Sequence, residues 1–364
     1  MPRRGENIYK RRDGRWEGRV LIDSKYHSVY ARSYSEVKQK LRSYSVKSMN
    51  DIQTDRNTVS DYATQWLAAV KLKCKLSTHN KYSNICKNHI VPLIGKRRIA
   101  DLSSANIEEM LENRSSLAPK TRSDILCVVK MVISYAQHCG CNCQLNLRAL
   151  AIRLPKGTMR VLSVSEQERL NQQLIAENSL RSVGILLAMS TGIRIGELCA
   201  LQRKDISFDN GMLRIGATMQ RIQIDDENTR TKIIISEPKS ACSIRDIPLS
   251  EQHISFFRQY YEDMPERAFL LSGEIGHFVE PAALRYYFGK VTAVCKLDGV
   301  HFHTLLHTFA TRCVEAGVEI KTLSEILGHE NVKITLDRYV HSSVEFKRDN
   351  MEKLLAYSPS LLPS

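Results

Sequence analysis

The sequence predicts a multidomain α+β protein with three parts: a small three-stranded β-sheet plus helix, a four-helix bundle, and a mixed, mainly helical domain with a small antiparallel sheet. Its length of 364 residues fits two or three domains. Hydrophobic residues alternate near the N-terminus and then change to helical spacing. Polar stretches at 46–57 and 153–160 separate the parts. We therefore expect domains over 1–48, 58–152 and 161–364.

Composition excludes the membrane and secreted classes. The chain has 53 Lys and Arg against 39 Asp and Glu, a net charge of +14, and 43% hydrophobic residues. No apolar run approaches the roughly 18 residues of a membrane span, and the charged start lacks the apolar segment of a secretory signal. We expect a cytoplasmic protein that has no membrane partner.

Ten cysteines are scattered along the chain, as buried thiols in a reducing compartment would be. The run HCGCNC at 138–143 invites a zinc interpretation. A structural zinc site needs a distant second pair of ligands, and the sequence offers none. We expect a turn that closes a helix here, and no metal.

The first domain is strongly basic. Residues 1–50 hold 13 Lys or Arg and 5 Asp or Glu, a net charge of +8 and more than half of the surplus. This asymmetry favours a polyanion, most commonly nucleic acid. A basic arm that serves only solubility is the alternative.

Strands predicted over 7–11, 15–22 and 26–32 form the small sheet. The dipeptide Asp13-Gly14 is a strong hairpin signal between the first two. A helix that begins near Ser35 covers one face, and the other face is free to enter a DNA groove. An inert hairpin domain is the alternative. The candidate DNA-binding residues, including one in the helical domain, are Arg3, Arg4, Lys10, Arg11, Arg12, Arg15, Arg19 and Lys120.

The second domain reads as helical throughout. Val59, Tyr62 and Trp66 begin one apolar stripe, and further stripes follow at 82–93, 107–111 and 125–135. Such stripes usually form a core and say little about function. The third domain opens at Ser163 with the spacing of a capping box. Two helices, strands over 212–215, 232–236 and 244–249, and further helices follow.

The sharpest chemical signals lie between residues 191 and 341. The run TGIRIGEL places Arg194 near a helix N-terminus, where an Arg can clamp a phosphate. Lys239 lies in a turn between two strands. His303 and His329 add imidazoles, and Tyr339 follows His329 by ten residues. Each signal is weak alone.

Together, and in this order, these residues resemble the tyrosine recombinase family, the integrases of phages and conjugative transposons. The flanking runs HTLLHTFAT at 303–311 and LGHENVKITLDRYVH at 327–341 carry the same resemblance. The basic start at 8–16 resembles an arm-type DNA-binding domain, and 58–150 is similar to a core-binding domain. The resemblance thus covers nearly the whole chain.

The resemblance implies site-specific recombination by strand cleavage and religation. Tyr339 would attack a DNA phosphate and leave a 3′-phosphotyrosyl link and a free 5′-hydroxyl. The pKa of a free Tyr lies near ~10, so this hydroxyl needs help from His303 or from nearby cations. Arg194 would neutralise charge on the phosphorane.

The remaining implied roles concern the leaving group and the support of the site. Lys239 would protonate the departing 5′-oxygen, and His329 would hydrogen-bond a non-bridging oxygen. Glu197, three residues after Arg194, would hold the site structurally. No metal or other cofactor is implied, because the phosphotyrosine stores the bond energy for religation.

The implied partners are double-stranded DNA at core and arm sites and a homotetramer in the synaptic complex, with an excisionase as a further candidate partner. The element would be a conjugative transposon or prophage that integrates and excises. The run LLAY at 354–357 is either a docking element between subunits or a frayed tail.

One departure from the family pattern concerns Leu306, which occupies the position of the second clamp Arg, three residues after His303. Leucine offers the phosphate neither charge nor a hydrogen bond. Losing one such donor costs about 10²–10³ in rate, so impaired catalysis is expected. A decayed element, a disabled protein, or a site that uses another cation such as Arg312 would each account for it.

Three other functions fit parts of the sequence. His303 and His307 have the spacing of a zinc protease helix, but Thr304 stands where the general base belongs, and His307 is expected to pack within the fold. A catalytically inactive, site-specific DNA-binding or regulatory protein derived from an integrase fits the charge and Leu306. A type IB topoisomerase shares the nucleophile chemistry but has no need of the arm-like start.

Overall fold

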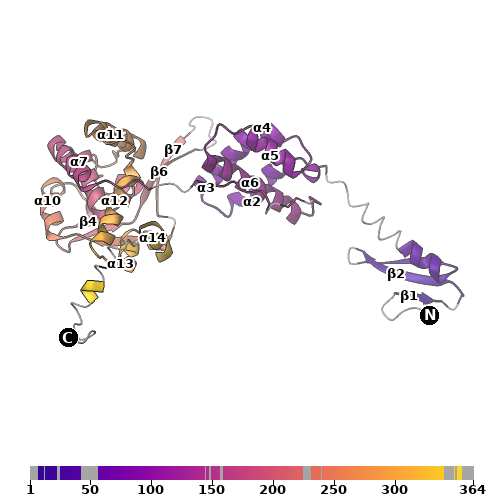
Figure 1. The fold of residues 1–364 in the computed structure, drawn as a ribbon. Coiled ribbons are helices and arrows are strands. Elements are labelled where there is room, and N and C mark those ends of the chain that lie inside the picture. The colour runs from indigo at the N-terminus through magenta and orange to yellow at the C-terminus, as the bar shows by residue number, and fades with distance from the viewer. Residues whose placement is uncertain are drawn as a thin grey trace. The chain divides into compact units, whose positions relative to one another are not determined.

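A computed structural model describes residues 7–11, 13–22, 25–41, 56–143, 145–146, 149–155, 159–223, 231–238, 240–339, 348 and 351–354. The contacts of the chain divide it into two compact units, 1–155 and 156–364, and Figure 1 labels many of their elements. Within these described ranges no helix is long and apolar enough to cross a membrane. The fold class matches the expected multidomain α+β arrangement.

The N-terminal sheet is antiparallel with the order β1 (Ile8–Lys10), β2 (Trp16–Ile22) and β3 (Lys25–Ala31). A helix over 34–41 covers one face. Gly18 of β2 permits this close approach, since a Cβ there would lie 2.5 Å from a methyl carbon of Val37. Ile8, Val29 and Val37 form the small core. Both the predicted strands and the predicted helix are confirmed.

The helical part of the first unit contains α2 (Val59–Lys71), α3 (Leu76–Ile85), α4 (Val91–Ile94), α5 (Ser104–Glu112) and α6 (Pro119–His138). A π-helical turn joins α3 to α4, so four helical stretches result, as predicted. Capping boxes at Thr58 and Ser103 begin α2 and α5. Cys141 and Cys143 lie buried in the bundle core just after α6 ends.

The second unit begins with α7 (Val164–Glu177), whose capping box pairs Ser163 with Glu166 as predicted. The buried helix α8 (Leu180–Thr191) and the short α9 (Ile195–Ala200) follow. Where one small sheet was predicted, the described residues form two. One joins β4 (Ile206–Ser207), β5 (Met212–Ile215) and β8 (Arg245–Pro248), and the other joins β6 (Thr218–Gln223) to β7 (Thr231–Ser236).

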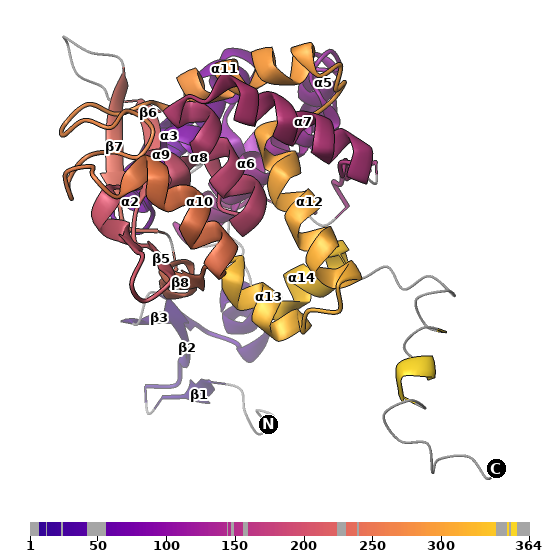
Figure 2. The same cartoon turned by 90° about the vertical axis from the view of Figure 1, so that its left-hand side faces the viewer.

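The rest of this unit is helical, with α10 (Glu251–Tyr261), α11 (Pro281–Val294), α12 (Phe302–Glu315), α13 (Ile320–Ile326) and α14 (Val332–Tyr339). The last three pack against one another, and both Figure 1 and Figure 2 show them together. Their shared apolar cluster contains Leu306, Leu323, Leu327 and Tyr339. This packing brings residues far apart in sequence to one place.

Candidate active site

A tight turn between α8 and α9 positions Arg194. Gly192 ends α8 with a positive φ of 67°, and a Cβ there would lie 2.5 Å from the Phe309 ring. Only glycine combines this backbone conformation with this close contact. Arg194 is the N-cap of α9, and its side chain is 34% exposed. The guanidinium is therefore anchored on a rigid turn yet reaches solvent.

Glu197 is a buried carboxylate that holds two arginines. It accepts hydrogen bonds from the backbone N–H and the Nη1 of Arg194, each at 3.0 Å, and from Nη2 of Arg245 at 2.9 Å. Nε of Arg245 also donates to the Ile326 carbonyl at 2.5 Å. Burial raises the Glu197 pKa, but the bonds and charges of Arg245 and Arg194 lower it overall. Glu197 and Arg245 thus join α9, β8 and the end of α13.

Arg245 was not predicted from the sequence, which places it in a strand without a motif of its own. We expect Glu197→Ala to cost about 3–5 kcal/mol of unfolding free energy, because it leaves a buried guanidinium unpaired. Chemical denaturation measures this loss. The control is Glu280→Ala, which breaks a more exposed ion pair with Arg221 and should cost less than about 1 kcal/mol. Equal losses in the two variants would contradict the supporting role of Glu197.

His329 lies just after α13, beside the Tyr339 ring. Its Nδ1 is 2.8 Å from Oγ1 of the buried Thr335. The His329 and Tyr339 rings are parallel, with centroids 6.5 Å apart. Burial and then the positive charges of Arg194 and Arg338 lower the pKa of His329 to about 4. The imidazole is therefore neutral at pH 7.

Helix α12 contributes His303 and His307 from one face. Their rings meet edge to face, with centroids 4.6 Å apart. The residue His303 is exposed, yet desolvation of the ring and the charges of Arg194 and Arg338 lower its pKa. His307 does more than pack within the fold, because its Nδ1 lies 2.9 Å from the Tyr339 hydroxyl. The expectation for His307 was therefore incomplete.

Tyr339 is the last residue of α14, and the residue is only 5% exposed. Burial raises the pKa of its hydroxyl, although the charges of Arg338 and Arg194 act in the opposite direction. Arg338 was not predicted as a site residue. Its charge also lowers the pKa of His303, His307 and His329, which marks it as a cation of this site.

Leu306 is 2% exposed and packs in the apolar cluster with Leu327 and Tyr339. Arg312, the cation suggested as a replacement for the missing Arg, is engaged by other groups. Nη2 of Arg312 donates to the Leu162 carbonyl at 2.7 Å, and Nη1 pairs with Glu315 at 2.5 Å. Its guanidinium is therefore held by groups outside the site.

Lys239 lies outside the described residues, three positions after β7 ends. The structure thus brings together Arg194, His303, His329 and Tyr339 and says nothing about the position of Lys239. Of the suggested docking element at 354–357, only Leu354 is described, in a short helical stretch. Among the described residues no group of three or more His, Cys, Asp and Glu could hold a metal ion.

The candidate DNA-binding residues are partly described. Arg3, Arg4 and Arg12 lie outside the described residues, and Lys10 is exposed on β1. The remaining three arginines of the N-terminal sheet form ion pairs: Arg15 with Asp13 at 2.8 Å, and Arg11 and Arg19 each with Glu17 at 2.9 Å. Lys120 of α6 pairs with Asp124 at 3.1 Å.

Glu17 holds two arginines of the N-terminal sheet, Arg11 and Arg19, in place. Its carboxylate is buried, and it also accepts a hydrogen bond from Ser28. Burial raises the Glu17 pKa, but hydrogen bonds from Arg19, Tyr9, Ser28 and Arg11 lower it to about 2. The guanidinium groups of Arg11 and Arg19 are held in place and remain about half exposed, at 42% and 51%.

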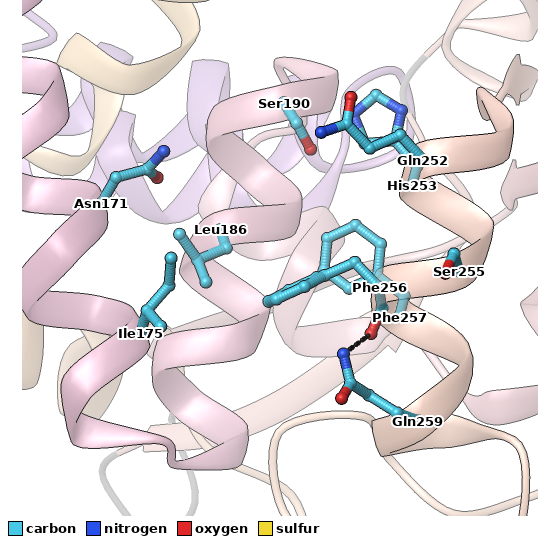
Figure 3. Close-up of a pocket in the computed structure, with 10 residues that line it drawn as sticks. All are labelled: Asn171, Ile175, Leu186, Ser190, Gln252, His253, Ser255, Phe256, Phe257 and Gln259. Atoms are coloured by element: carbon cyan, nitrogen blue, oxygen red, sulfur yellow. Dashed lines mark hydrogen bonds between the residues drawn. The ribbon is translucent and has the colours of Figure 1, made fainter.

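A pocket of about 560 Å³ lies elsewhere in the second unit, between α7, α8 and α10 (Figure 3). It contains none of the residues around Tyr339. Its one imidazole belongs to His253, whose Nδ1 accepts a hydrogen bond from the Ser250 backbone N–H at 3.3 Å and lies 2.8 Å from the Ser250 hydroxyl, as part of the α10 cap. The lining residues are Asn171, Ile175, Leu186, Ser190, Gln252, His253, Ser255, Phe256, Phe257 and Gln259.

Comparison with known families agrees with this geometry. The family described as the phage integrase family matches residues 160–345. The phage integrase, N-terminal SAM-like domain matches residues 58–113. Together these two matches cover the helical bundle as far as the end of α5 and most of the unit that contains Tyr339.

Similar proteins are curated as recombinases and transposases. A tyrosine recombinase XerC-like protein of Caldanaerobacter subterraneus subsp. tengcongensis is 27% identical over 94% of this chain and 93% of its own. A tyrosine recombinase of Thermosipho africanus is 30% identical over 49% of this chain and 56% of its own. The transposase from transposon Tn916 of Enterococcus faecalis is 27% identical over 46% of this chain and 45% of its own. The chain thus matches about half the length of the last two.

Solved structures share the fold. The Tn1549 transposon integrase in complex with transposon right end DNA has a TM-score of 0.66 and 20% identity, over 82% of this chain and 99% of that one. A lambda integrase dimer bound to a core site has a TM-score of 0.60 and 16% identity, over 93% of this chain and 97% of that one. A lambda integrase tetramer bound to a Holliday junction has a TM-score of 0.59 and 15% identity, over 94% of this chain and 98% of that one.

Proposed function

The chain belongs to the phage integrase family of tyrosine recombinases, which are site-specific DNA recombinases, and we propose that it integrates and excises a mobile element through a 3′-phosphotyrosyl intermediate. The observation that carries this proposal is the meeting of Arg194, His303 and His329 around the Tyr339 side chain. The charge of Arg194 lowers the pKa of His303, His329 and Tyr339. A cluster of one arginine and two imidazoles around a tyrosine is not expected from core packing alone, because burying charged and polar groups costs free energy.

In the proposed reaction the Tyr339 oxygen attacks the scissile phosphorus, and the bond from phosphorus to the 5′-oxygen breaks. Arg194 stabilises charge on the non-bridging oxygens, because it is anchored by Glu197 while its side chain reaches solvent. His329 donates from Nε2 to the same phosphate, since Thr335 holds its Nδ1. Lys239 supplies the proton to the departing 5′-oxygen. Energy stored in the phosphotyrosyl bond drives religation, so no metal or nucleotide cofactor enters.

Leu306 weakens this site. A buried leucine contributes no charge at a position where a second guanidinium would face the phosphate. We propose that Arg338, whose charge lowers the pKa of Tyr339, takes over part of that role. We propose that the chain cleaves DNA slowly. The alternative, favoured by Leu306 alone, is a catalytically inactive DNA-binding or regulatory protein derived from an integrase.

A nicked suicide duplex that carries the core site separates the two functions. Cleavage releases a short 5′-hydroxyl fragment that diffuses away, so a recombinase accumulates a covalent protein–DNA adduct that survives denaturing electrophoresis. We expect this adduct. A complex that forms in native gels but leaves no adduct over long incubation would support the alternative.

The proposed domains are an arm-type DNA-binding domain over 1–48, a core-binding domain over 58–152 and a catalytic domain over 161–364. We further propose that the chain binds double-stranded DNA at arm and core sites and acts as a homotetramer that joins two duplexes. The support is likeness to a lambda integrase that was solved as a tetramer on a Holliday junction. An excisionase is proposed as the factor that sets direction.

The arm assignment predicts a separable binding activity. Deleting residues 1–50, which carry a net charge of +8, should weaken binding to arm sites and leave binding to the core site largely intact. Each neutralised phosphate contributes roughly −0.9 to the slope of log K against log salt for duplex DNA, so the intact chain should show the steeper slope. Footprinting and salt titration measure both effects. Unchanged footprints and an unchanged slope would contradict the assignment.

A further inference from the structure

We propose that His307 is the general base that accepts the proton of the Tyr339 hydroxyl during strand cleavage, an inference that rests on the proposed function above. The two residues lie on α12 and α14, which pack directly against each other. Nδ1 of His307 and the phenolic oxygen are 2.9 Å apart, within the reach of a direct proton transfer. Their ring centroids are 5.8 Å apart.

Both partners of this hydrogen bond are neutral before cleavage. Burial, and then the charges of His303, Arg338 and His329, lower the pKa of His307 to about 4, so the imidazole is neutral at pH 7. Burial raises the pKa of the Tyr339 hydroxyl, which is therefore protonated. The proposed proton transfer requires the phenol to donate and Nδ1 to accept. The proposal therefore assigns to His307 the tautomer that carries its proton on Nε2.

The other two imidazoles are engaged differently. Nδ1 of His329 is bonded to Thr335, and its ring lies parallel to that of Tyr339 with the ring centroids 6.5 Å apart. His303 meets the edge of the His307 ring. Within the described residues, no hydrogen bond joins either of them to the Tyr339 hydroxyl. We therefore assign the removal of the Tyr339 proton, first expected of His303, to His307, which lies one helical turn later.

The proton and the bonds balance in a single step. As the Tyr339 oxygen bonds to phosphorus, its proton moves to Nδ1 of His307, and the 5′-oxygen leaves with a proton from Lys239. Religation runs the same step in reverse. The groups that face His307 are His303 on its own helix, His329 after α13, and Arg338 with Tyr339 on α14. A DNA phosphate bound among these cations offsets their charge and favours the imidazolium, so the base becomes effective when substrate binds.

The pH dependence of cleavage tests this inference. We expect the intact chain to cleave the suicide duplex at a rate that is nearly constant from pH 6 to 9. His307→Gln keeps a hydrogen-bond acceptor but takes up no proton, so single-turnover cleavage at pH 7 should fall about 10²–10⁴-fold. It should then rise about tenfold per pH unit, because the phenol must ionise unaided. His303→Gln should retain the flat profile, and His277→Gln, which changes an exposed imidazole, serves as the matched control.

A loss of the same factor at every pH would show that His307 only positions Tyr339, and would overturn the inference. A second measurement does not depend on any variant's activity. The ¹⁵N shifts of imidazole-labelled intact chain should show a bare Nδ1 and a protonated Nε2 for His307, assigned by the signal that His307→Gln lacks. A protonated Nδ1 would overturn the inference. Absence of any adduct, even from Leu306→Arg, would instead count against the proposed function.

Discussion

Leu306→Arg should raise the single-turnover rate of DNA cleavage by about 10²–10³, because it restores one hydrogen-bond donor to the transition state. Position 306 follows His303 by three residues on α12, so the two side chains share a face of the helix. A guanidinium there would donate charge-assisted hydrogen bonds that strengthen as charge accumulates on the phosphate. DNA affinity should change far less than the rate.

The same substitution should lower the melting temperature. Leu306 is 2% exposed among Leu323, Leu327 and Tyr339, so an Arg loses apolar packing and must extend its charged end toward solvent. Thermal melting reports this cost, and Leu306→Met, which keeps an apolar side chain of similar size, is the control that should gain no activity.

A change in the DNA tests the same point without altering the fold. A methylphosphonate at the scissile position removes the negative charge that the missing guanidinium would neutralise. The unaltered chain should therefore gain more from this substrate than Leu306→Arg does. A well-folded Leu306→Arg protein with no gain, together with no benefit from methylphosphonate, would mean that the missing clamp is not what limits cleavage.

Tyr339→Phe should abolish the covalent adduct while leaving DNA binding within about twofold of the original, because an apolar isostere preserves the buried contacts that pack the helix. Phenylalanine keeps the ring that packs against Leu306 and Leu327 but removes the attacking oxygen. Gel-shift titration measures the binding, and the suicide duplex measures the adduct. Tyr286→Phe is the matched control, since that phenol is exposed and belongs to α11.

Periodicity and turn chemistry predicted much of the fold. The Asp13-Gly14 turn, the capping box at Ser163 and the strand at 212–215 all occur as expected. Strand β6 was missed because its buried residues are Met219 and Ile222, which do not alternate. Strand β4 has only two residues and leaves no pattern. Strands β4 and β6 are therefore defined by their pairing with β5 and β7 and not by their own sequence pattern.

The candidate site was predicted in part. The motif order identified Arg194, His303, His329 and Tyr339, which the structure brings together. Arg245 and His307 could not be found in this way, because each acts through a contact between separate elements. Arg338 was missed although it directly precedes Tyr339 in the sequence. For His307 one signal was present in the sequence: it lies four residues after His303, on the same face of the helix. The roles of all these residues stay predictions.

The most direct test of the account is to identify the amino acid that carries the DNA. The adduct trapped on a suicide duplex would be digested with protease and nuclease, and the nucleotide-bearing peptide sequenced by mass spectrometry. If Tyr339 is the nucleophile, we expect a 3′-phosphotyrosyl link on Tyr339, in the peptide that follows Arg338. A link to Tyr357, to any other tyrosine or to a serine would contradict it.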